Sequence, residues 1–544
     1  MPQATTNVVI LGGGFAGVYT AMYLSRALTA DERRRIRITL VNKENYIVFQ
    51  PLLPEVISGA IEMLHVISPI RRLVPGAELY TREIEAIDLQ QRTVRLAPGF
   101  RPKPLTLPFD HLVIGLGTRL DAAKVPGMQE HAIPFKYLGD ALRLRNHLVH
   151  VLEEAAIETD QQQREKLLTF VVAGGGFSGI ECMAELNDFV REAIKHYPTI
   201  QPHELRMIVL QSGERILPEM VERLANFAHR LLTERGIDIR LRTRLQAVTA
   251  ESAIIQNQLT HQREAIPTRT VVATVPAGAH PLLEQLPCQR QAGRLCVTEF
   301  LNVPDWPGVW ALGDCAAVPQ PDGILSPPTA QHALRQARTC AANVLAEIRG
   351  GRKQPFSFTG LGKLGSLGRR SAVAELFGVK FSGLPAWLIW RAVYLWKLPG
   401  FDRKIRALMD WFLDVILPRD ITQVRIFQPD AVIQEHFEPG EIVFDQGDFG
   451  DKIYFIVKGE VVVIRDNEVV ARLSDGDVFG EIALVSDTAR TASVLATTPL
   501  DVVTVSRSAF KKLLAHLPGV RSTMSEIMRQ HLAESAELRQ QINS

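Results

Sequence analysis

The feature that most constrains the fold is an apolar strand, a glycine-rich turn and a helix in direct succession, a pattern that occurs twice. The first copy, NVVILGGGFAGVYTAMYLSRAL at residues 7–28, contains Gly12, Gly14 and Gly17. In such a GxGxxG turn the first glycine allows the tight bend. The second lets the backbone approach a pyrophosphate, and the third lets the helix pack against the strand. A second strand, RIRITLVN, follows. This setting predicts a Rossmann-like dinucleotide-binding domain.

The second copy, LLTFVVAGGGFSGIECMAEL at residues 167–186, contains Gly174, Gly176 and Gly179 and is followed by the strand RMIVLQSGERILP. Two such folds in one chain predict two dinucleotides that face each other. Further on, the strand GVWALGDCA ends at Gly313 and Asp314. A carboxylate in that place can accept hydrogen bonds from a ribityl or ribose hydroxyl.

Length and composition limit the remaining possibilities. A chain of 544 residues is too long for one core, and about three or four domains are expected. The formal net charge of +2 points to no nucleic-acid partner. The five cysteines form no CxxC pair, so neither a disulfide framework, a dithiol centre nor a metal site is predicted. A buried strand begins almost at once in place of a signal peptide, which predicts a chain on the cytosolic side.

The order of the two fingerprints and the Gly-Asp strand end resembles the two-dinucleotide flavoprotein reductases. Within that superfamily, four stretches resemble the type II (non-proton-pumping) NADH:quinone oxidoreductases: ENYIVFQPLLPEV (44–56), GGGFSGIECMAEL (174–186), PPTAQHALRQA (327–337) and LGSLGRRSAVAELFG (364–378). The resemblance covers residues 7 to about 420. It implies FAD in the first fold, with its ribityl chain over Asp314, and NAD(P)H in the second. Hydride would pass from the nicotinamide to flavin N5, and a membrane quinone would then be reduced.

The sequence departs from the usual nucleotide pattern at the end of each second strand. An acid there normally accepts from the adenosine ribose. The first fold has Asn42 in that place with Glu44 two residues on, and either can reach the FAD ribose. The second fold has Gln211, which would not repel the 2′-phosphate of NADPH as a glutamate would. We therefore predict that NADPH is tolerated better than in relatives that have an acid at this position.

The resemblance also implies the residues of the quinone side. Gln331 and Gln336 match positions that line the quinone channel in this family, and Glu181 matches a glutamate thought to relay a proton. Arg335 replaces the first glutamine of a pair, which favours an anionic or acidic acceptor or partly blocks the pocket. The alternative for the two glutamines is an ordinary polar role at a helix N-terminus.

Residues 384–420 predict an interface. They contain four of the six tryptophans, at positions 387, 390, 396 and 411. An apolar stripe at helical spacing follows Arg403, Lys404 and Arg406, and it comprises Ile405, Leu408, Met409, Phe412 and Ile416. Aromatic amphipathic helices with basic neighbours lie in the headgroup plane of anionic membranes. We expect a peripheral protein on the cytoplasmic face. The alternatives are a helical hairpin packed on the core or a dimer interface, and a homodimer is expected only by analogy.

After Pro418 the sequence changes to short alternating strands, which predict a β jelly-roll with flanking helices at residues 508–516 and about 521–540. This module closely resembles the cyclic-nucleotide-binding domain, and FGEIALVSDTARTASV (479–494) resembles its phosphate-binding cassette.

The chemistry of the cassette agrees with that likeness. Gly480 allows the turn, and the amides of Glu481, Ile482 and Ala483 face an anion. Arg490 can bind the cyclic phosphate, and Glu481 can accept from the ribose 2′-OH. Thr491 leaves cAMP and cGMP equally open. Alternatively, Glu481 and Arg490 pair with each other and the module mediates assembly.

The predicted fold class is therefore α/β, with two Rossmann-like domains and a C-terminal jelly-roll. The expected parts are a first FAD-binding segment (1–120), an NAD(P)H-binding domain (121–299), a returning FAD-binding segment (300–380), membrane-associating helices (381–420) and a cyclic-nucleotide-binding domain (425–544). The first interpretation is a nucleotide-regulated FAD-dependent NAD(P)H:quinone reductase. A soluble reductase of a protein acceptor and a nucleotide-responsive redox sensor with little turnover are the alternatives.

Overall fold

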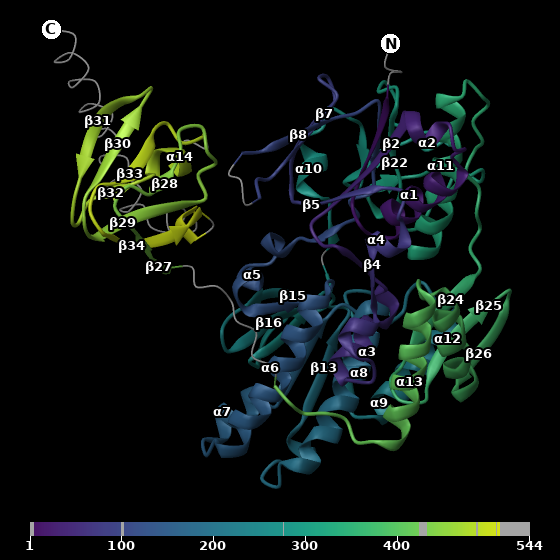
Figure 1. Ribbon diagram of the computed structural model, residues 1–544. Coiled ribbons are helices and arrows are strands. Elements are labelled where there is room, and N and C mark those ends of the chain that lie inside the picture. Colours follow the sequence, from purple (N-terminus) through teal and green to yellow (C-terminus); the bar gives the residue numbers. More distant parts are fainter. Residues whose placement is uncertain are drawn as a thin grey trace. The chain divides into compact units, whose positions relative to one another are not determined.

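The structure is a computed structural model that describes residues 5–99, 103–275, 277–423, 432–485, 488–507 and 509–511 (Figure 1). The chain divides into two compact units. One comprises residues 1–94 and 108–425, and the other comprises residues 95–107 and 426–544.

The first unit contains a parallel sheet whose strands follow the order β22-β9-β1-β2-β5. The strands are β1 (Thr6–Leu11), β2 (Ile36–Asn42), β5 (Glu78–Thr81), β9 (His111–Ile114) and β22 (Val309–Ala311). β1 is central because Val8, Val9, Ile10 and Leu11 are all buried, as a strand covered on both faces requires. Helix α1 (Phe15–Ala27) packs against α11 (Ala330–Ile348), so segments more than 300 residues apart meet beside this sheet (Figure 1).

A second parallel sheet in this unit follows the order β11-β18-β12-β13-β14. Its strands are β11 (Ala132–Pro134), β12 (Thr169–Ala173), β13 (Arg206–Leu210), β14 (Ile237–Arg240) and β18 (Thr270–Ala273). The associated helices are α6 (Leu138–Ile157), α8 (Phe177–Ala193) and α9 (Glu222–Glu234). Every residue of β12 is buried, as the run TFVVA predicts for a central strand.

The antiparallel sheet β24-β25-β26 leads into a helical hairpin of α12 (Leu384–Lys397) and α13 (Phe401–Ile416), which Figure 1 shows side by side. The strands are β24 (Gly362–Ser366), β25 (Ala372–Leu376) and β26 (Val379–Gly383). The tryptophans of the hairpin divide between two faces: Trp390 and Trp411 are buried, whereas Trp396 is 81% exposed. Among the described residues, no helix has the length and the apolar content to cross a membrane.

The other unit contains two antiparallel four-stranded sheets, in the orders β27-β34-β29-β32 and β28-β33-β30-β31. The elements are β27 (Val432–Phe437), β28 (Ile442–Phe444), β29 (Lys452–Lys458), β30 (Val461–Arg465), β31 (Glu468–Leu473), β32 (Val478–Phe479), α14 (Glu481–Val485), β33 (Ser493–Ala496) and β34 (Leu500–Ser506). Asp466 and Asn467 both have positive φ, at 54° and 68°, and form the expected tight turn between β30 and β31.

These sheets confirm the predicted fold class: two parallel α/β sheets and a C-terminal antiparallel jelly-roll. The five domain boundaries stay predictions. The helical segments expected at 508–516 and about 521–540 lie almost wholly outside the described residues.

The remaining described elements are short. They are α2 (Glu32–Arg35), α3 (Leu53–Ser58), α4 (Ile70–Leu73), α5 (Met128–His131), α7 (Gln161–Leu167), α10 (Pro281–Glu284), β3 (Tyr46–Val48), β4 (Ile67–Pro69), β6 (Ile84–Asp88), β7 (Thr93–Leu96), β8 (Leu105–Pro108), β10 (Arg119–Leu120), β15 (Thr243–Val248), β16 (Ser252–Asn257), β17 (Arg263–Pro267), β19 (Ala277–Gly278), β20 (Arg290–Gln291), β21 (Arg294–Cys296) and β23 (Ala316–Ala317), with six 3-10 turns, of which Gly313–Cys315 bears on the site.

Candidate functional site

The first glycine turn leaves no room for a side chain at its first and third glycines, and we call this turn a cradle. Gly12 has φ +102°, and a Cβ on it would lie 2.4 Å from the carbonyl oxygen of Gly115. A Cβ on Gly17 would lie 1.9 Å from the carbonyl oxygen of Gly12, which confirms the close packing of helix on strand. Gly14 faces open space at the N-terminus of α1, and no side chain caps that helix. The cradle therefore fits a pyrophosphate, which would accept hydrogen bonds from the backbone amides at the start of the helix.

Asn42, at the end of β2, stabilises this turn through hydrogen bonds to the backbone. Its Oδ1 accepts from the amide of Gly13 at 2.8 Å, and its Nδ2 donates to the carbonyl of Glu44 at 2.8 Å. The carboxamide thus stabilises the loop, while the side chain of Glu44 is exposed beside it. Contact of either residue with an FAD ribose stays a prediction.

Gly313 and Asp314 lie in the 3-10 turn Gly313–Cys315 that follows β22. The amide of Gly313 donates to Oε1 of Gln336 at 2.8 Å, and Gln336 is 2% exposed. Burial raises the pKa of the Asp314 carboxyl, and the nearby Lys136 opposes that rise. Gln336 therefore supports the Gly-Asp turn from within the core, which is a more internal position than a channel lining implies.

The second glycine turn repeats the geometry of the first. Gly174 has φ +122°, and a Cβ on Gly179 would lie 1.8 Å from the carbonyl oxygen of Gly174. Gly176 begins α8, and the nearest atom to its added Cβ is Oε1 of Glu219 at 3.9 Å. The two cradles are thus equivalent in their close approaches and in their open second glycine.

Gln211, at the end of β13, occupies the place that Asn42 has in the first fold. Its Oε1 accepts from the amide of Gly175 at 3.2 Å, and its Nε2 donates to the carbonyl of Arg215 at 3.0 Å. Both ends of the carboxamide therefore bind backbone. This support role was not apparent from the sequence, where the position suggested only a ribose contact.

Gln331 and Arg335 lie near the start of α11. Gln331 bonds the backbone on both sides of its carboxamide: Oε1 accepts from Leu361 at 3.1 Å, and Nε2 donates to Gly362 at 3.2 Å. The guanidinium of Arg335 stacks over the ring of Phe358 at 4.2 Å from its centroid. These contacts fix the segment before β24 against α11.

Glu181 lies on α8 and is 8% exposed. Its Oε1 accepts from the amide of Ser366 at 2.8 Å. Burial raises the pKa of the Glu181 carboxyl to about 8, against the opposing effect of the Ser366 hydrogen bond. The carboxyl therefore holds a proton at neutral pH, which is the state that a proton donor requires.

Three further buried carboxyls were missed from the sequence, namely those of Glu55, Glu185 and Asp414. The one available signal was that Glu185 follows Glu181 by four residues on a helix, so both face the same side. Glu55 and Asp414 come from α3 and α13, and only the packing brings them together.

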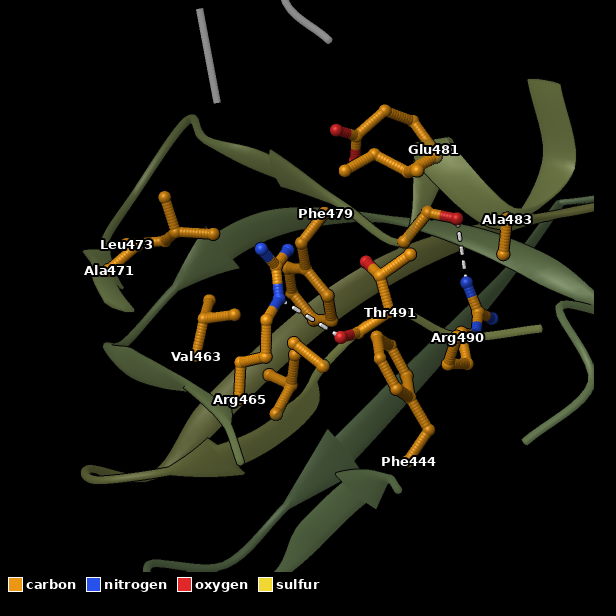
Figure 2. A pocket seen from close by; sticks show the side chains of 14 residues that line it. Phe444, Val463, Arg465, Ala471, Leu473, Phe479, Glu481, Ala483, Arg490 and Thr491 are labelled. Atoms are coloured by element: carbon orange, nitrogen blue, oxygen red, sulfur yellow. Dashed lines mark hydrogen bonds between the residues drawn. The ribbon is translucent and has the colours of Figure 1, made fainter. Parts of the chain in front are cut away.

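The second unit has a pocket that is lined in part by the predicted phosphate-binding cassette (Figure 2). Gly480 has φ +83°, and a Cβ there would lie 2.5 Å from Nη1 of Arg490. Glu481 and Arg490 are both buried, at 1% and 3% exposed. The pocket is lined by Phe444, Val463, Arg465, Ala471, Leu473, Phe479, Gly480, Glu481, Ile482, Ala483, Arg490, Thr491, Ala492 and Val494.

Arg490 is held at one side of this pocket (Figure 2). Nη1 donates to the carbonyl of Gly480 at 2.6 Å, and Nη2 donates to the carbonyl of Lys452 at 2.7 Å. The guanidinium lies 4.1 Å from the ring centroid of Phe444, and its buried Nε has no hydrogen-bond partner among the described residues. Burial lowers the pKa of Arg490, so an anion beside it would stabilise the charge.

Arg465 was not identified from the sequence. It lines the pocket across from Arg490, with Thr491 between them (Figure 2). Its Nε donates to the carbonyl of Thr491 at 3.1 Å. The pocket thus has a guanidinium on each of two sides.

Comparison with known proteins agrees with this architecture. Residues 6–337 match the family described as pyridine nucleotide-disulphide oxidoreductase, residues 361–420 match the NDH2 C-terminal domain, and residues 434–516 match the cyclic nucleotide-binding domain. The fold and the two cradles therefore define a flavoprotein reductase with two dinucleotide-binding folds. Within that class, the chain belongs to the type II NADH:quinone oxidoreductase family.

Two relatives illustrate the match. The type II NADH:quinone oxidoreductase Ndh of Mycobacterium tuberculosis is 30% identical over 429 residues, which cover 77% of this chain and 90% of the relative. The demethylphylloquinone reductase NdbB of Synechocystis is 30% identical over 414 residues, which cover 76% and 96%. NDH2 of Plasmodium falciparum in complex with NADH has the same fold, with a TM-score of 0.71 at 19% identity over 77% of this chain and 100% of that one.

These comparisons confirm the predicted family and its use of NAD(H) and a flavin. The individual site residues stay predictions.

Proposed function

We propose that this chain is an FAD-dependent NAD(P)H:quinone oxidoreductase that works at a lipid surface and responds to a cyclic nucleotide. The observation that carries the proposal is the pair of equivalent glycine cradles in a chain of this family. Each combines a close-packed third glycine with an open helix N-terminus. One cradle suits FAD and the other suits NAD(P)H.

Residues of the chain would hold and orient the two cofactors. Amides near Gly14 would bind the FAD pyrophosphate, and those near Gly176 would bind that of NAD(P)H. Asp314 would accept from the ribityl hydroxyls, and the nearby Lys136 opposes the rise that burial causes in the pKa of its carboxyl. When bound, the flavin accepts hydride from the nicotinamide and passes electrons to the quinone. Glu181 would provide a proton on the quinone side.

The outer face of α13 supports a lipid surface as the place of work. Ile405, Leu408, Met409, Phe412 and Ile416 are between 48% and 62% exposed, so the predicted stripe is not used for packing within the described part of this chain. Arg406 is exposed beside it. A quinone acceptor dissolves in lipid, and anionic lipid is enriched on the cytosolic leaflet, so we place the stripe there. A homodimer stays a prediction by analogy.

The pocket of the second unit supports a cyclic nucleotide as the regulator. Arg490 would bind the cyclic phosphate through its unpartnered Nε, and Glu481 would accept from the ribose 2′-OH. Thr491 and Arg465 face the remaining volume, where cAMP and cGMP differ. Calorimetry on the native chain should detect binding of one of the two, and Arg490→Ala should abolish it. Unchanged affinity in that variant would place the site elsewhere.

Turnover with a soluble quinone analogue tests the enzymatic proposal. NAD(P)H should bleach the flavin, and the quinone should restore its colour at a rate compatible with steady-state turnover. Flavin that NAD(P)H reduces but quinone does not reoxidise would indicate a protein acceptor instead. Nucleotide binding without turnover would indicate a redox sensor.

A further inference from the structure

Behind Glu181 the first unit buries a set of charged side chains, which we name the acidic cluster. It contains four carboxyls and two guanidiniums from four elements and the segment after α13: Glu55 (α3), Glu181 and Glu185 (α8), Arg391 (α12), Asp414 (α13) and Arg419. Two cations cannot neutralise four carboxylates, and burying an uncompensated charge is costly. The cluster must therefore retain protons.

The contacts and the burial of each group indicate which carboxyls of the acidic cluster retain protons. The cation nearest to Glu55 stays distant, since Nη2 of Arg391 lies 3.7 Å from its Oε1. The hydrogen bond that Nε1 of Trp411 donates to Oε2 at 2.6 Å lowers the pKa of Glu55, but by less than burial raises it. Arg419 pairs more closely with Asp414, at 3.2 Å, than with Glu185, at 3.9 Å. Burial raises the pKa of Glu55 to about 8, and Arg391 opposes that rise only in part. Burial likewise raises the pKa of Glu185.

A small cavity adjoins the cluster, and exposed side chains are among those that line it. Glu55, Glu185, Arg391, Asp414 and Arg419 line it together with Arg369 and Arg370, which are exposed. Oε2 of Glu185 and Nη1 of Arg419 are buried at this cavity and lack a hydrogen-bond partner among the described residues. Buried polar atoms of this kind in a polar cavity are normally satisfied by water.

The chemistry of quinone reduction requires a source of protons. A quinone becomes a quinol by gaining two electrons and two protons. NAD(P)H provides two electrons and one proton as hydride, so one further proton must come from solution. Glu181, close to the second cradle on α8, is screened from solvent by burial and needs a route by which its proton is replaced.

We propose that the acidic cluster and its cavity deliver this second proton, and that Glu55 and Glu185 are its positioning residues. The proposal rests on the quinone reductase function proposed above. The O–H bond of Glu181 breaks as an O–H bond forms at the quinone oxygen, and a carboxylate remains on Glu181. Glu185, one helical turn away, and then Glu55 return a proton to that carboxylate. A proton from solution, carried by water in the cavity, then protonates Glu55 again.

Other groups set the protonation of these carboxyls and must be held constant in any test. Besides the cluster itself, the groups that face it are Asp188 on α8, Ser58 on α3, Ser366 on β24, Trp390 and Tyr394 on α12, Trp411 on α13, and Arg369 and Arg370 at the cavity mouth. Substitutions therefore have to preserve shape. Glutamine resembles a protonated glutamate and can still accept from Trp411, but it cannot exchange a proton.

The test compares the two half-reactions in the flavin-loaded full-length protein by stopped-flow absorbance. In Glu55→Gln and Glu185→Gln, reduction of the flavin by NADH should stay within twofold of native. Reoxidation by a soluble quinone analogue should slow by at least about tenfold, with the largest loss at alkaline pH, because a relayed proton is missing. Ferricyanide takes electrons without protons, so its reduction should stay at the native rate. Glu55→Asp should recover part of the loss.

A second measurement does not depend on turnover. Infrared spectra of the native protein should contain carboxylic acid C=O bands that shift in D2O, and Glu55→Gln should remove one of them. Glu347→Gln, which alters a carboxyl paired with Lys353 outside the cluster, should remove none. Native reoxidation rates in both glutamine variants, or an unchanged set of bands, would overturn the proposal. If the native protein reduces ferricyanide but no quinone, the proposed function itself fails whatever the variants do.

Discussion

At the scale of single residues, Asn42 and Gln211 occupy corresponding positions and explain how the two copies of the strand–turn–helix pattern form equivalent cradles. Each carboxamide accepts from the middle glycine of its turn, Gly13 or Gly175, and donates to a carbonyl just beyond the strand. A carboxylate could accept but not donate, so an acid at either position would lose one of these bonds. The amide is thus suited to holding the loop, and neither Asn42 nor Gln211 adds a negative charge to its turn.

The substitution Gln211→Glu tests this interpretation. The new carboxylate would repel the 2′-phosphate of NADPH and face the carbonyl of Arg215, so kcat/KM for NADPH should fall by about tenfold or more, while that for NADH changes little. Steady-state kinetics with both nucleotides measures the effect. A native preference for NADH above ~100-fold, about 2.7 kcal/mol, would contradict the premise that glutamine tolerates NADPH.

At the scale of elements, α13 shows what a periodic pattern can and cannot reveal. Its stripe at positions 405, 408, 409, 412 and 416 was identified as one face, and the structure leaves that face exposed. The same pattern could not show which tryptophans face inward. Trp411 turns to the core because its indole donates to the buried Glu55, and Trp390 packs against it with ring centroids 6.4 Å apart.

The α13 stripe should control binding to membranes. Replacing Phe412 and Ile416 by serine removes two exposed apolar side chains from the stripe, so co-sedimentation with anionic liposomes should drop by about tenfold or more, with thermal stability unchanged. Ile157→Ser with Leu259→Ser is a matched control, because both residues are exposed, at 76% and 63%, on other elements. Equal losses in the two double variants would argue against a specific lipid-binding face.

The parts of the fold that sequence predicted are those with local causes. The central strands β1 and β12 follow from apolar runs that end in glycine turns, and the β30–β31 turn follows from Asp466 and Asn467. The acidic cluster could not be predicted, because Glu55 and Asp414 are 359 residues apart in sequence and each looks like an ordinary surface acid. The inward orientation of Gln336 could not be predicted for the same reason, because its hydrogen-bond partner, Gly313, belongs to another element.

At the scale of the whole molecule, the buried carboxyls make stability depend on pH in an unusual direction. The pKa of Glu55 and that of Glu181 are both raised from 4.5 to about 8 in the folded chain. Between these values the folded state holds a proton that the unfolded state has lost, so each group makes the free energy of unfolding fall as pH rises, by about 1.4 kcal/mol per pH unit. Above about pH 8 both states are ionised and the slope ends.

Denaturant unfolding of the full chain between pH 5 and pH 10 isolates this effect when native protein is compared with Glu55→Gln. The glutamine cannot ionise, so the variant should gain stability relative to native as pH rises, and the difference should level off above about pH 8. Glu347→Gln should run parallel to native. A difference that stays constant across the range would mean that Glu55 is ionised in the fold, held by Arg391.

If the pocket of the second unit binds a cyclic nucleotide, as proposed above, a thermodynamic link between that pocket and quinone reduction can be tested. A cyclic nucleotide can change turnover only if it binds two conformations of the chain with different affinity, and that difference sets the largest possible effect. Typical couplings of about 1–3 kcal/mol correspond to about 5- to 150-fold. Quinone turnover by the full chain on liposomes should therefore change in saturating cyclic nucleotide. Arg490→Ala should keep the nucleotide-free rate and lose the response.

By reciprocity, reducing the flavin or adding lipid should shift the nucleotide affinity in calorimetry. An affinity that neither condition alters would show that the second unit binds its ligand without regulating the first.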